Sequence, residues 1–341
     1  MMNKTYFSIS LVALLLVITT TGCSKNDSSA QQEMTDNFKA LVMGGKDIDP
    51  NHTWSTGVIS PIKVNVNLDQ NATYTVFILL SDPLVDANAK YVGMAQIKGG
   101  ESKIIYATVP SLSTSLYAAC YDKDGHFTRI SVTGDEITFS GELAQSGSEP
   151  LYNGMYYAFE FPDEKNIKDF DYNDLVLLVS TPHDNGNGSY TCFVSVAAVG
   201  TTMNTTLYYN GTQMGEEVHR VWNVENSEMI NVKTVTSQPR YLGEITFNSA
   251  DADIRHLPLS LHISDSNGKL SLDLSQPTTA NQAPLYFSVN GDAQAKWRWC
   301  LEGKNIGLAF LNFSIWASNQ QTATDWYNSD NASYIQVVPK W

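Results

Sequence analysis

The chain has few cysteines and lacks the common catalytic and metal motifs. It holds four Cys in 341 residues, and no CxxC pair occurs. This excludes a zinc-ribbon type of site and a dense disulfide framework. No HExxH and no G-x-S-x-G is present either, so neither a zinc protease nor a hydrolase nucleophile elbow has support. We therefore expect no catalytic residues and a protein that is not an enzyme.

Basic residues are also scarce. The chain has 21 Lys and Arg against 35 Asp and Glu, a net charge of −14. Loss of a signal segment containing Lys4 would leave 21 − 1 = 20 basic residues and a net charge of −15. This balance disfavours nucleic acid as a partner and favours cations as ligands. A solvated acidic exterior explains most of the charge without any ligand.

The chain has no run of 18 apolar residues, and its one membrane-related signal is at the N-terminus. Lys4 is followed by a short apolar run at residues 11–18 and by small residues at 19–22, which is typical of a secretory signal. The Cys23 that follows resembles the lipobox of bacterial lipoproteins, in which the Cys receives diacylglycerol, although Thr20 stands where the pattern has Leu. The alternative is an ordinary signal peptide with a chance Cys near its end.

Polar composition after Cys23 predicts a flexible tether over residues 23–38. Beyond it, short segments with apolar residues at alternate positions are separated by turn residues, as in Ile62, Val64 and Val66. The pattern predicts an all-β protein with two β-sandwich-like domains, at 39–140 and 150–341. Helical spacing of apolar residues predicts one short helix near 304–318.

Three cysteines would remain in the mature chain: Cys120, Cys192 and Cys300. Each has apolar or aromatic neighbours, which favours buried thiols. A disulfide bond between Cys192 and Cys300 remains an alternative.

An acidic cluster precedes the apolar run at 175–179. Asp169, Asp171 and Asn173 occupy alternate positions, and Asp174 follows at once. Ca²⁺ takes six to eight oxygen ligands, and a loop with oxygen side chains at every second residue can turn several of them toward one ion. The spacing is similar to the start of an EF-hand loop, but Asp174 stands at the position of the invariant Gly and a strand follows. The cluster therefore predicts a calcium site outside the EF-hand class.

A second interpretation of the same cluster needs no metal. Asp and Asn side chains can accept hydrogen bonds from nearby backbone N–H groups and so cap the start of a strand. If the segment before the cluster pairs with residues 174–180, Glu160 could complete a calcium shell. The same carboxylates could serve a glycosidase only if two of them faced each other across a cleft.

Residues 158–180 resemble the opening of the LruC domain of Gram-negative surface lipoproteins, which is marked by an acidic D-x-D-[YF]-N-D-[LV]-V run. A Val-His pair at 218–219 before an Ile-Asn step at 230–231 matches a second hallmark. A third is a W-x-[WY]-P-x-E segment, here WRWCLE at 297–302, followed by a helix and by Trp-Tyr at 326–327. This chain has Cys where that segment usually has Pro.

The resemblance implies a β-rich extracellular module whose acidic run binds calcium, with no catalytic activity. It also implies a cell-envelope location, with the lipid in the outer membrane and the protein exposed at the surface. Two functions then follow: binding or adhesion to a glycan or protein, or a structural part of a surface assembly in which calcium only stabilises the fold. Trp54 and Trp326, flanked by polar residues, are expected to be exposed aromatics for sugar contact.

Overall fold

A computed structural model of the chain describes residues 25–113, 115–162, 169–235, 237–277, 280–291 and 297–336. The predicted signal segment 1–22 and the predicted lipidation residue Cys23 lie outside these residues. The described part is mostly β-strand and forms four sheets, which confirms the all-β fold class. None of its described helices combines the length and the apolar character needed to cross a membrane.

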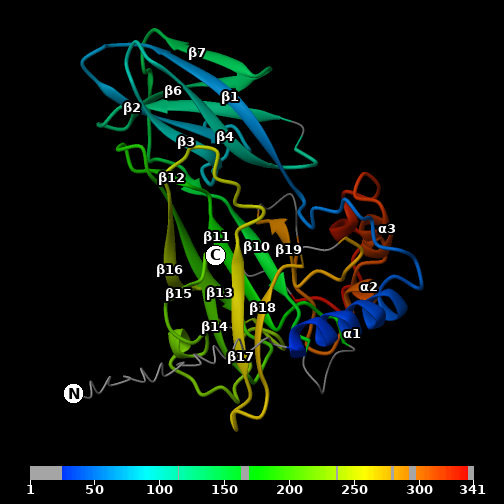
Figure 1. The fold of residues 1–341 in the computed structure, drawn as a ribbon. Coiled ribbons are helices and arrows are strands. Elements are labelled where there is room, and N and C mark those ends of the chain that lie inside the picture. Colours follow the sequence, from blue (N-terminus) through cyan, green and yellow to red (C-terminus); the bar gives the residue numbers. More distant parts are fainter. Residues whose placement is uncertain are drawn as a thin grey trace, which may run out of the picture.

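The first β-sandwich lies at the top of Figure 1. A three-stranded sheet in the order β4-β1-β7 packs on a six-stranded sheet in the order β8-β6-β5-β2-β3-β9. Ile62, Val64 and Val66 are buried between the two sheets, as their alternation with polar residues predicts. The strands are β1 (Gly57–Asn67), β2 (Thr73–Leu79), β3 (Lys90–Lys98), β4 (Ser102–Pro110), β5 (Leu116–Tyr121), β6 (His126–Val132), β7 (Glu136–Ser140), β8 (Gln145–Ser146) and β9 (Leu151–Tyr152).

The second region is built on a larger pair of sheets. One sheet has the order β12-β13-β11-β10-β19 with β16 paired to β13, and the other has the order β15-β14-β17-β18. Their facing side chains form one apolar core. The strands are β10 (Gly154–Phe159), β11 (Leu175–Ser180), β12 (His183–Asp184), β13 (Tyr190–Ala198), β14 (Asn204–Tyr209), β15 (Thr212–Met214), β16 (Arg240–Phe247), β17 (Leu259–Ser264), β18 (Ser271–Ser275) and β19 (Tyr286–Asn290).

Helices cover the other face of the six-stranded sheet that contains β10. Ala158, Val176 and Phe287 project from that face into a second, aromatic-rich core. Figure 1 shows α1 and the C-terminal helices gathered on this side of the molecule. The helices are α1 (Lys25–Leu41), α2 (Ile306–Ala309) and α3 (Phe313–Ser318), with 3₁₀ turns η1 (Arg220–Trp222) and η2 (Trp326–Asn328). The single helix predicted at 304–318 is therefore two short helices, because the chain is extended at Phe310.

The prediction of a flexible tether over 23–38 is wrong for the residues that the structure describes. Residues 25–41 form α1, and Met34 and Phe38 are completely buried in the aromatic core. The spacing of four residues places both side chains on one face of the helix. The free energy gained by packing that face therefore outweighs the tendency of a polar segment to remain disordered.

Two further predictions are corrected by the same core. The first domain was predicted to begin at residue 39, but residues 42–54 pack on the second region and the first sandwich begins at Gly57. Trp54 and Trp326 were predicted to be exposed, yet they are 9% and 0% exposed. Both rings contact Trp316 of α3, with centroids 5.8 and 5.3 Å from its ring.

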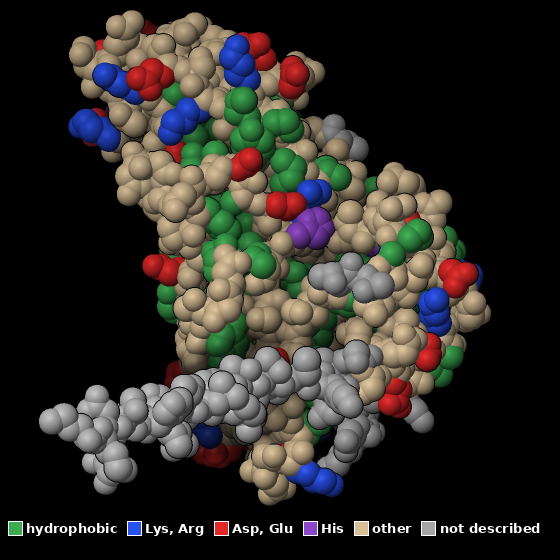
Figure 2. Space-filling model, in the orientation of Figure 1, with side chains coloured by type: hydrophobic (Ala, Val, Ile, Leu, Met, Phe, Trp, Pro, Cys, Tyr) green, Lys and Arg blue, Asp and Glu red, His purple; other side chains and the backbone are tan. Residues whose placement is uncertain are grey.

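A buried carboxylate joins the two regions. Asp184 at the end of β12 is fully buried, and its Oδ2 accepts a hydrogen bond from the backbone N–H of Gln96 at 3.0 Å. The same oxygen lies 3.1 Å from Nζ of Lys103. These two contacts join β12 of the second region to β3 and β4 of the first. Figure 2 shows the joined regions as one continuous surface, with acidic and basic side chains scattered over it.

His52 fastens the segment after α1 to the C-terminal helices. Its Nδ1 accepts a hydrogen bond from the backbone N–H of Trp54 at 2.9 Å, so Nε2 carries the proton and donates to the carbonyl of Trp316 at 3.0 Å. A second proton on the ring would remove the bond from Trp54. Burial lowers the pKa of His52 to about 4, although the Trp316 carbonyl and Asp49 oppose the shift.

This depressed pKa predicts a loss of stability in acid. Between pH 6.5 and 4 the unfolded chain binds a proton at His52 that the folded protein does not, so unfolding becomes easier as the pH falls through that window. The expected difference is roughly 3 kcal/mol of unfolding free energy between neutral pH and pH 4. Urea unfolding of the wild type and of His52→Gln at several pH values checks it. The variant should lose this part of the pH dependence, and equal slopes in both proteins would contradict it.

Candidate metal centre

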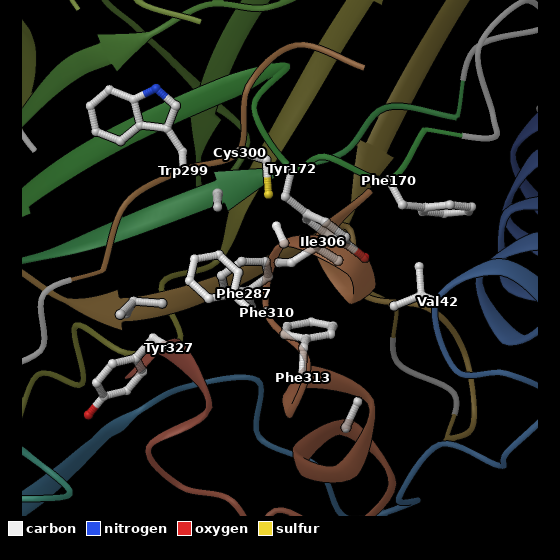
Figure 3. Close-up of a cluster of buried hydrophobic side chains, with 14 of the residues drawn as sticks. Val42, Phe170, Tyr172, Phe287, Trp299, Cys300, Ile306, Phe310, Phe313 and Tyr327 are labelled. Carbon is white, nitrogen blue, oxygen red and sulfur yellow. The ribbon is translucent and has the colours of Figure 1, made fainter. Parts of the chain in front are cut away.

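The acidic loop before β11 has an unusual backbone. Phe170 and Tyr172 have φ angles of 46° and 52°, a left-handed conformation that bulky residues rarely adopt. Both side chains are fully buried in the aromatic core, as Figure 3 shows for the space between α1 and the C-terminal helices. Because the two aromatic residues turn inward, the alternate residues Asp169, Asp171 and Asn173 are presented together beside the core. The loop is thus held by its apolar residues and carries its polar ones as a group.

Glu160 supports this backbone from within. Strand β10 pairs with β11, Phe159 opposite Leu175, which is the pairing on which its predicted role depended. However, its two carboxylate oxygens accept hydrogen bonds from the backbone N–H groups of Phe170 at 3.2 Å and Tyr172 at 2.9 Å. One carboxyl group thus binds the N–H groups of both residues with left-handed backbone. Glu160 therefore holds the strained loop and stands outside the cluster of candidate metal ligands.

Three carboxylates converge on the other side of the loop. Oxygen atoms of Asp169, Asp171 and Glu302 all lie within 4.8 Å of one another. Asp171 is oriented by two backbone donors, the N–H of Asn173 at 3.1 Å and the N–H of Gly303 at 2.7 Å. Oε2 of Glu302 is buried and has no hydrogen-bond partner among the residues that the structure describes. A buried acceptor in that state is costly unless a cation or a donor meets it.

Asn173 and Gly200 complete the arrangement. The side-chain Nδ2 of Asn173 donates to the carbonyl of Cys300 at 3.2 Å, which turns Oδ1 toward Gly200. A Cβ atom at Gly200 would lie 2.0 Å from Oδ1 of Asn173 and 3.0 Å from Oε2 of Glu302. Only glycine fits there, and two acceptor oxygens occupy the space beside it. A cation is the kind of ligand that such a pair of acceptors can share.

Asp174 has a different role from its neighbours. Its Oδ2 accepts a hydrogen bond from the backbone N–H of Phe161 at 2.6 Å, and its carbonyl accepts one from Gly200 at 3.1 Å. Together with the bond from Asn173 to Asp171, these are the backbone contacts that the capping interpretation predicts. Capping at Asp174 and a carboxylate cluster at Asp169 and Asp171 therefore coexist in one loop.

The electrostatics of the cluster favour a bound cation. Burial raises the pKa of Asp171 well above its usual range, and the charges of Asp169 and Glu302 raise it further. Burial also raises the pKa of Glu302 to about 7, with Asp169 adding to the effect and Lys233 opposing it. Like charges that are held together out of water repel unless they are neutralised by protons or by a cation. Carboxylate and amide oxygens are the hard ligands that suit Ca²⁺ rather than Zn²⁺.

Segments far apart in the sequence hold Gly200 and Glu302 in place. Val199 forms an isolated β-bridge with Ile230, and Nε2 of His219 lies 3.1 Å from the carbonyl of Thr201. Residues 297–302 are in turn held by hydrogen bonds to residues 231 and 232. Nε1 of Trp299 donates to the carbonyl of Asn231 at 2.8 Å, and the backbone N–H of Glu302 donates to Val232 at 3.1 Å. The three motifs that carry the resemblance thus meet around one site.

Of the predicted ligands, the structure brings Asp169, Asp171 and Asn173 together and uses Glu160 and Asp174 for the backbone. Glu302 was not among the predicted ligands. It is 131 positions from Asp171, so no local pattern connects them, and the one signal was its place in the WRWCLE segment. Cys120, Cys192 and Cys300 are free and buried, so the prediction of buried thiols is confirmed and Cys192 and Cys300 do not pair.

No family model matches the sequence, and no curated protein matches it. Among solved structures, the crystal structure of a protein described as a putative lipoprotein from Bacteroides ovatus is similar, with a TM-score of 0.40 and 10% sequence identity. The similarity covers 80% of this chain and 100% of that chain.

Proposed function

We propose that this chain is a lipid-anchored protein of the cell envelope whose second β-rich region binds a calcium ion. The carboxylates of Asp169, Asp171 and Glu302 and the amide oxygen of Asn173 are the protein ligands. The observation that carries the metal site is the buried, unsatisfied Oε2 of Glu302, which lies among like charges and beside Oδ1 of Asn173. Four side chains leave room for water or backbone oxygens in the usual shell of six to eight.

In this proposal the protein acts in surface binding or adhesion, with a glycan or another surface protein as its ligand. The anchor is Cys23, and the lipid lies in the outer membrane with the folded region exposed. The acidic net charge supports this choice of partners over nucleic acid. No catalytic residues are part of the proposal, because the clustered carboxylates are committed to the ion and to the backbone.

A second function is favoured by the position of the site. The ligands come from two segments, 169–173 and 302, that are packed on the aromatic core, so an ion there would fasten the C-terminal segment to the sheet. Calcium would then only stabilise a structural part of a surface assembly. The two functions differ in one comparison: a binding protein holds its ligand more strongly in calcium than in chelator. A structural protein shows no such ligand and co-purifies with its partners in the assembly.

The anchor itself is tested by the substitution Cys23→Ala. Because the thiol is the acceptor of the lipid, the variant should incorporate no labelled fatty acid and should leave the membrane fraction. Labelling of growing cells followed by fractionation measures both effects, with Cys120→Ala as a control that removes a buried thiol elsewhere. Equal labelling of the wild type and of Cys23→Ala would reject the lipid anchor.

A further inference from the structure

A cleft of about 500 Å³ lies beside the aromatic core, with Ile48 and Trp54 of that core among its lining residues. Three segments form it: residues 48–54 after α1, residues 256–258 before β17, and residues 276–277 and 280–286 before and at the start of β19. Figure 2 shows the face of the molecule that is hollowed between the strands and the lobe of α1 and the C-terminal helices, with a histidine at its rim. The volume is within the range of sites for small organic ligands, about 300–1,000 Å³.

The walls of the cleft are rigid and partly apolar. Prolines contribute to all three segments, and the nearly buried rings of Trp54 and Tyr286 are also among the lining residues. His52 stacks beside Trp54 with ring centroids 4.1 Å apart, and the hydroxyl of Tyr286 donates to the carbonyl of Leu257 at 2.8 Å. These contacts fix both rings before any ligand arrives. The exposed apolar surfaces of Pro50 and Pro258 suit the C–H faces of a sugar ring. The lining prolines are Pro50, Pro258, Pro277 and Pro284.

The free polar groups of the cleft are neutral. The side-chain amides of Asn281 and Gln282 and the hydroxyl of Thr53 form no hydrogen bond with other residues in the described part of the chain. An amide offers both donors and an acceptor, which is what a sugar hydroxyl can use in either direction. No Lys or Arg is among the described lining residues. The lining therefore disfavours a phosphate, sulfate or carboxylate ligand.

The charged and titratable lining residues are already engaged within the protein. Oδ1 and Oδ2 of Asp49 accept hydrogen bonds from the backbone N–H groups of Asn51 and Gln320, at 2.9 and 3.1 Å. The ring nitrogens of His256 lie 3.0 Å from Asp253 and 2.8 Å from the carbonyl of Thr53. Hydrolysis of a glycoside needs two carboxyl groups on opposite sides of the bond. The described lining holds one carboxylate, that of Asp49, and it is already hydrogen-bonded. The cleft therefore fits saccharide binding better than glycoside hydrolysis.

From these features we propose that the cleft formed by residues 48–54, 256–258, 276–277 and 280–286 binds a neutral saccharide. The inference rests on the proposed binding function and names its ligand class and its site. Asn281, Gln282 and Thr53 contact the sugar hydroxyls, and the proline surfaces contact its ring.

One hydrogen bond links this cleft to the metal loop. The buried hydroxyl of Tyr172 donates to the carbonyl of Pro284 at 3.2 Å. On the other side of Pro284, the backbone N–H of Ala283 donates to the hydroxyl of Thr35 on α1 at 3.1 Å. An ion at Asp171 fixes the loop that carries Tyr172, and so fixes one wall of the cleft. Calcium should therefore strengthen saccharide binding without contacting the sugar.

The test uses the mature full-length protein on a printed array of neutral, sialylated and sulfated glycans, followed by calorimetry with the strongest neutral oligosaccharide. We expect retention of neutral glycans. Ala280→Trp, which fills the cleft from an exposed position, should weaken binding at least tenfold. Gln282→Ala removes one hydrogen bond and should weaken it about two- to tenfold. Ala87→Trp places the same ring at an exposed position of the first sandwich and should change nothing.

Retention of no saccharide, or of anionic glycans alone, overturns the proposal, as does binding that survives both cleft variants. Retention of a peptide from a parallel peptide array, with no sugar bound, also overturns it. The calcium-induced melting shift is measured on the same samples. A normal shift without saccharide binding means that the cleft inference alone is wrong. Saccharide binding that Ala280→Trp abolishes, in a protein that shows no calcium shift, supports the cleft and rejects the metal site.

Discussion

Calcium raises the melting temperature of the wild-type protein, and Glu302→Gln melts at the same temperature in calcium and in chelator: this is the expected result at the metal site. An ion that binds only the folded state stabilises it by RT ln(1 + [L]/Kd), roughly 2.7 kcal/mol at a hundredfold excess over Kd. For a region of this size, the gain corresponds to a shift of roughly 5–10 °C. The substitution keeps the shape of the side chain and removes its charge.

Glu302→Gln is a cleaner test than a change at Asp171. The Asp171 carboxylate also accepts the backbone N–H groups of Asn173 and Gly303, so its loss would disturb the loop. Oε2 of Glu302 has no such partner among the described residues. In chelator the variant should melt at or above the wild-type temperature, because it lacks a carboxylate whose ionisation is disfavoured by burial and by the charge of Asp169. The order of the two melting temperatures should therefore reverse, with the wild type more stable in calcium and the variant more stable in chelator. Such a reversal is the signature of a cation site.

The matched control is Glu142→Gln, the same change at an exposed position outside the cluster. It should keep the full calcium shift. Differential scanning calorimetry of the three proteins in calcium and in chelator measures all the outcomes together. If the wild type melts identically in both buffers, the metal site is rejected and the capping contacts at Asp171 and Asp174 account for the acidic loop.

The second large effect is expected at α1. Phe38 is fully buried, and its ring centroid lies 5.6 Å from Phe170, 6.1 Å from Trp54 and 6.5 Å from Phe313. Phe38→Ala would leave a cavity among these rings and should cost about 3–5 kcal/mol of unfolding free energy. Because Phe38 also packs on Tyr172, the acidic loop should loosen and calcium affinity should fall with it.

Urea unfolding of Phe38→Ala beside Glu33→Ala measures this cost. Glu33 is exposed on the same helix, so its substitution should change the unfolding free energy by less than about 0.5 kcal/mol. A flexible tether would make both substitutions equally harmless. A Phe38→Ala protein as stable as Glu33→Ala would therefore show that α1 does not belong to the folded core.

Strands were predictable because their signal is local. Alternation places Ile62, Val64 and Val66 on one face of β1, and the turn at 122–125 joins β5 to β6 as a hairpin. In that turn, Oδ1 of Asp122 accepts the backbone N–H groups of Asp124 and His126, which is the capping that Asp favours. No distant residue is needed for either feature.

The helix α1 and the full metal centre depend on contacts that a local pattern does not contain. Only the spacing of Met34, Phe38 and Val42 hints at the buried face of α1, within a segment of Ser, Gln and Asn. The acidic loop was found from its composition, yet the role of Glu160 follows from the left-handed backbone at Phe170 and Tyr172. Aromatic residues adopt that backbone only where the surrounding core imposes it.

The most direct test of the central claim is a crystal structure of the mature protein grown with calcium. The account predicts anomalous density for one ion, with oxygen atoms of Asp169, Asp171, Asn173 and Glu302 at about 2.3–2.6 Å from it. Density for water alone at this place, with Glu302 hydrogen-bonded to it in saturating calcium, would contradict the account.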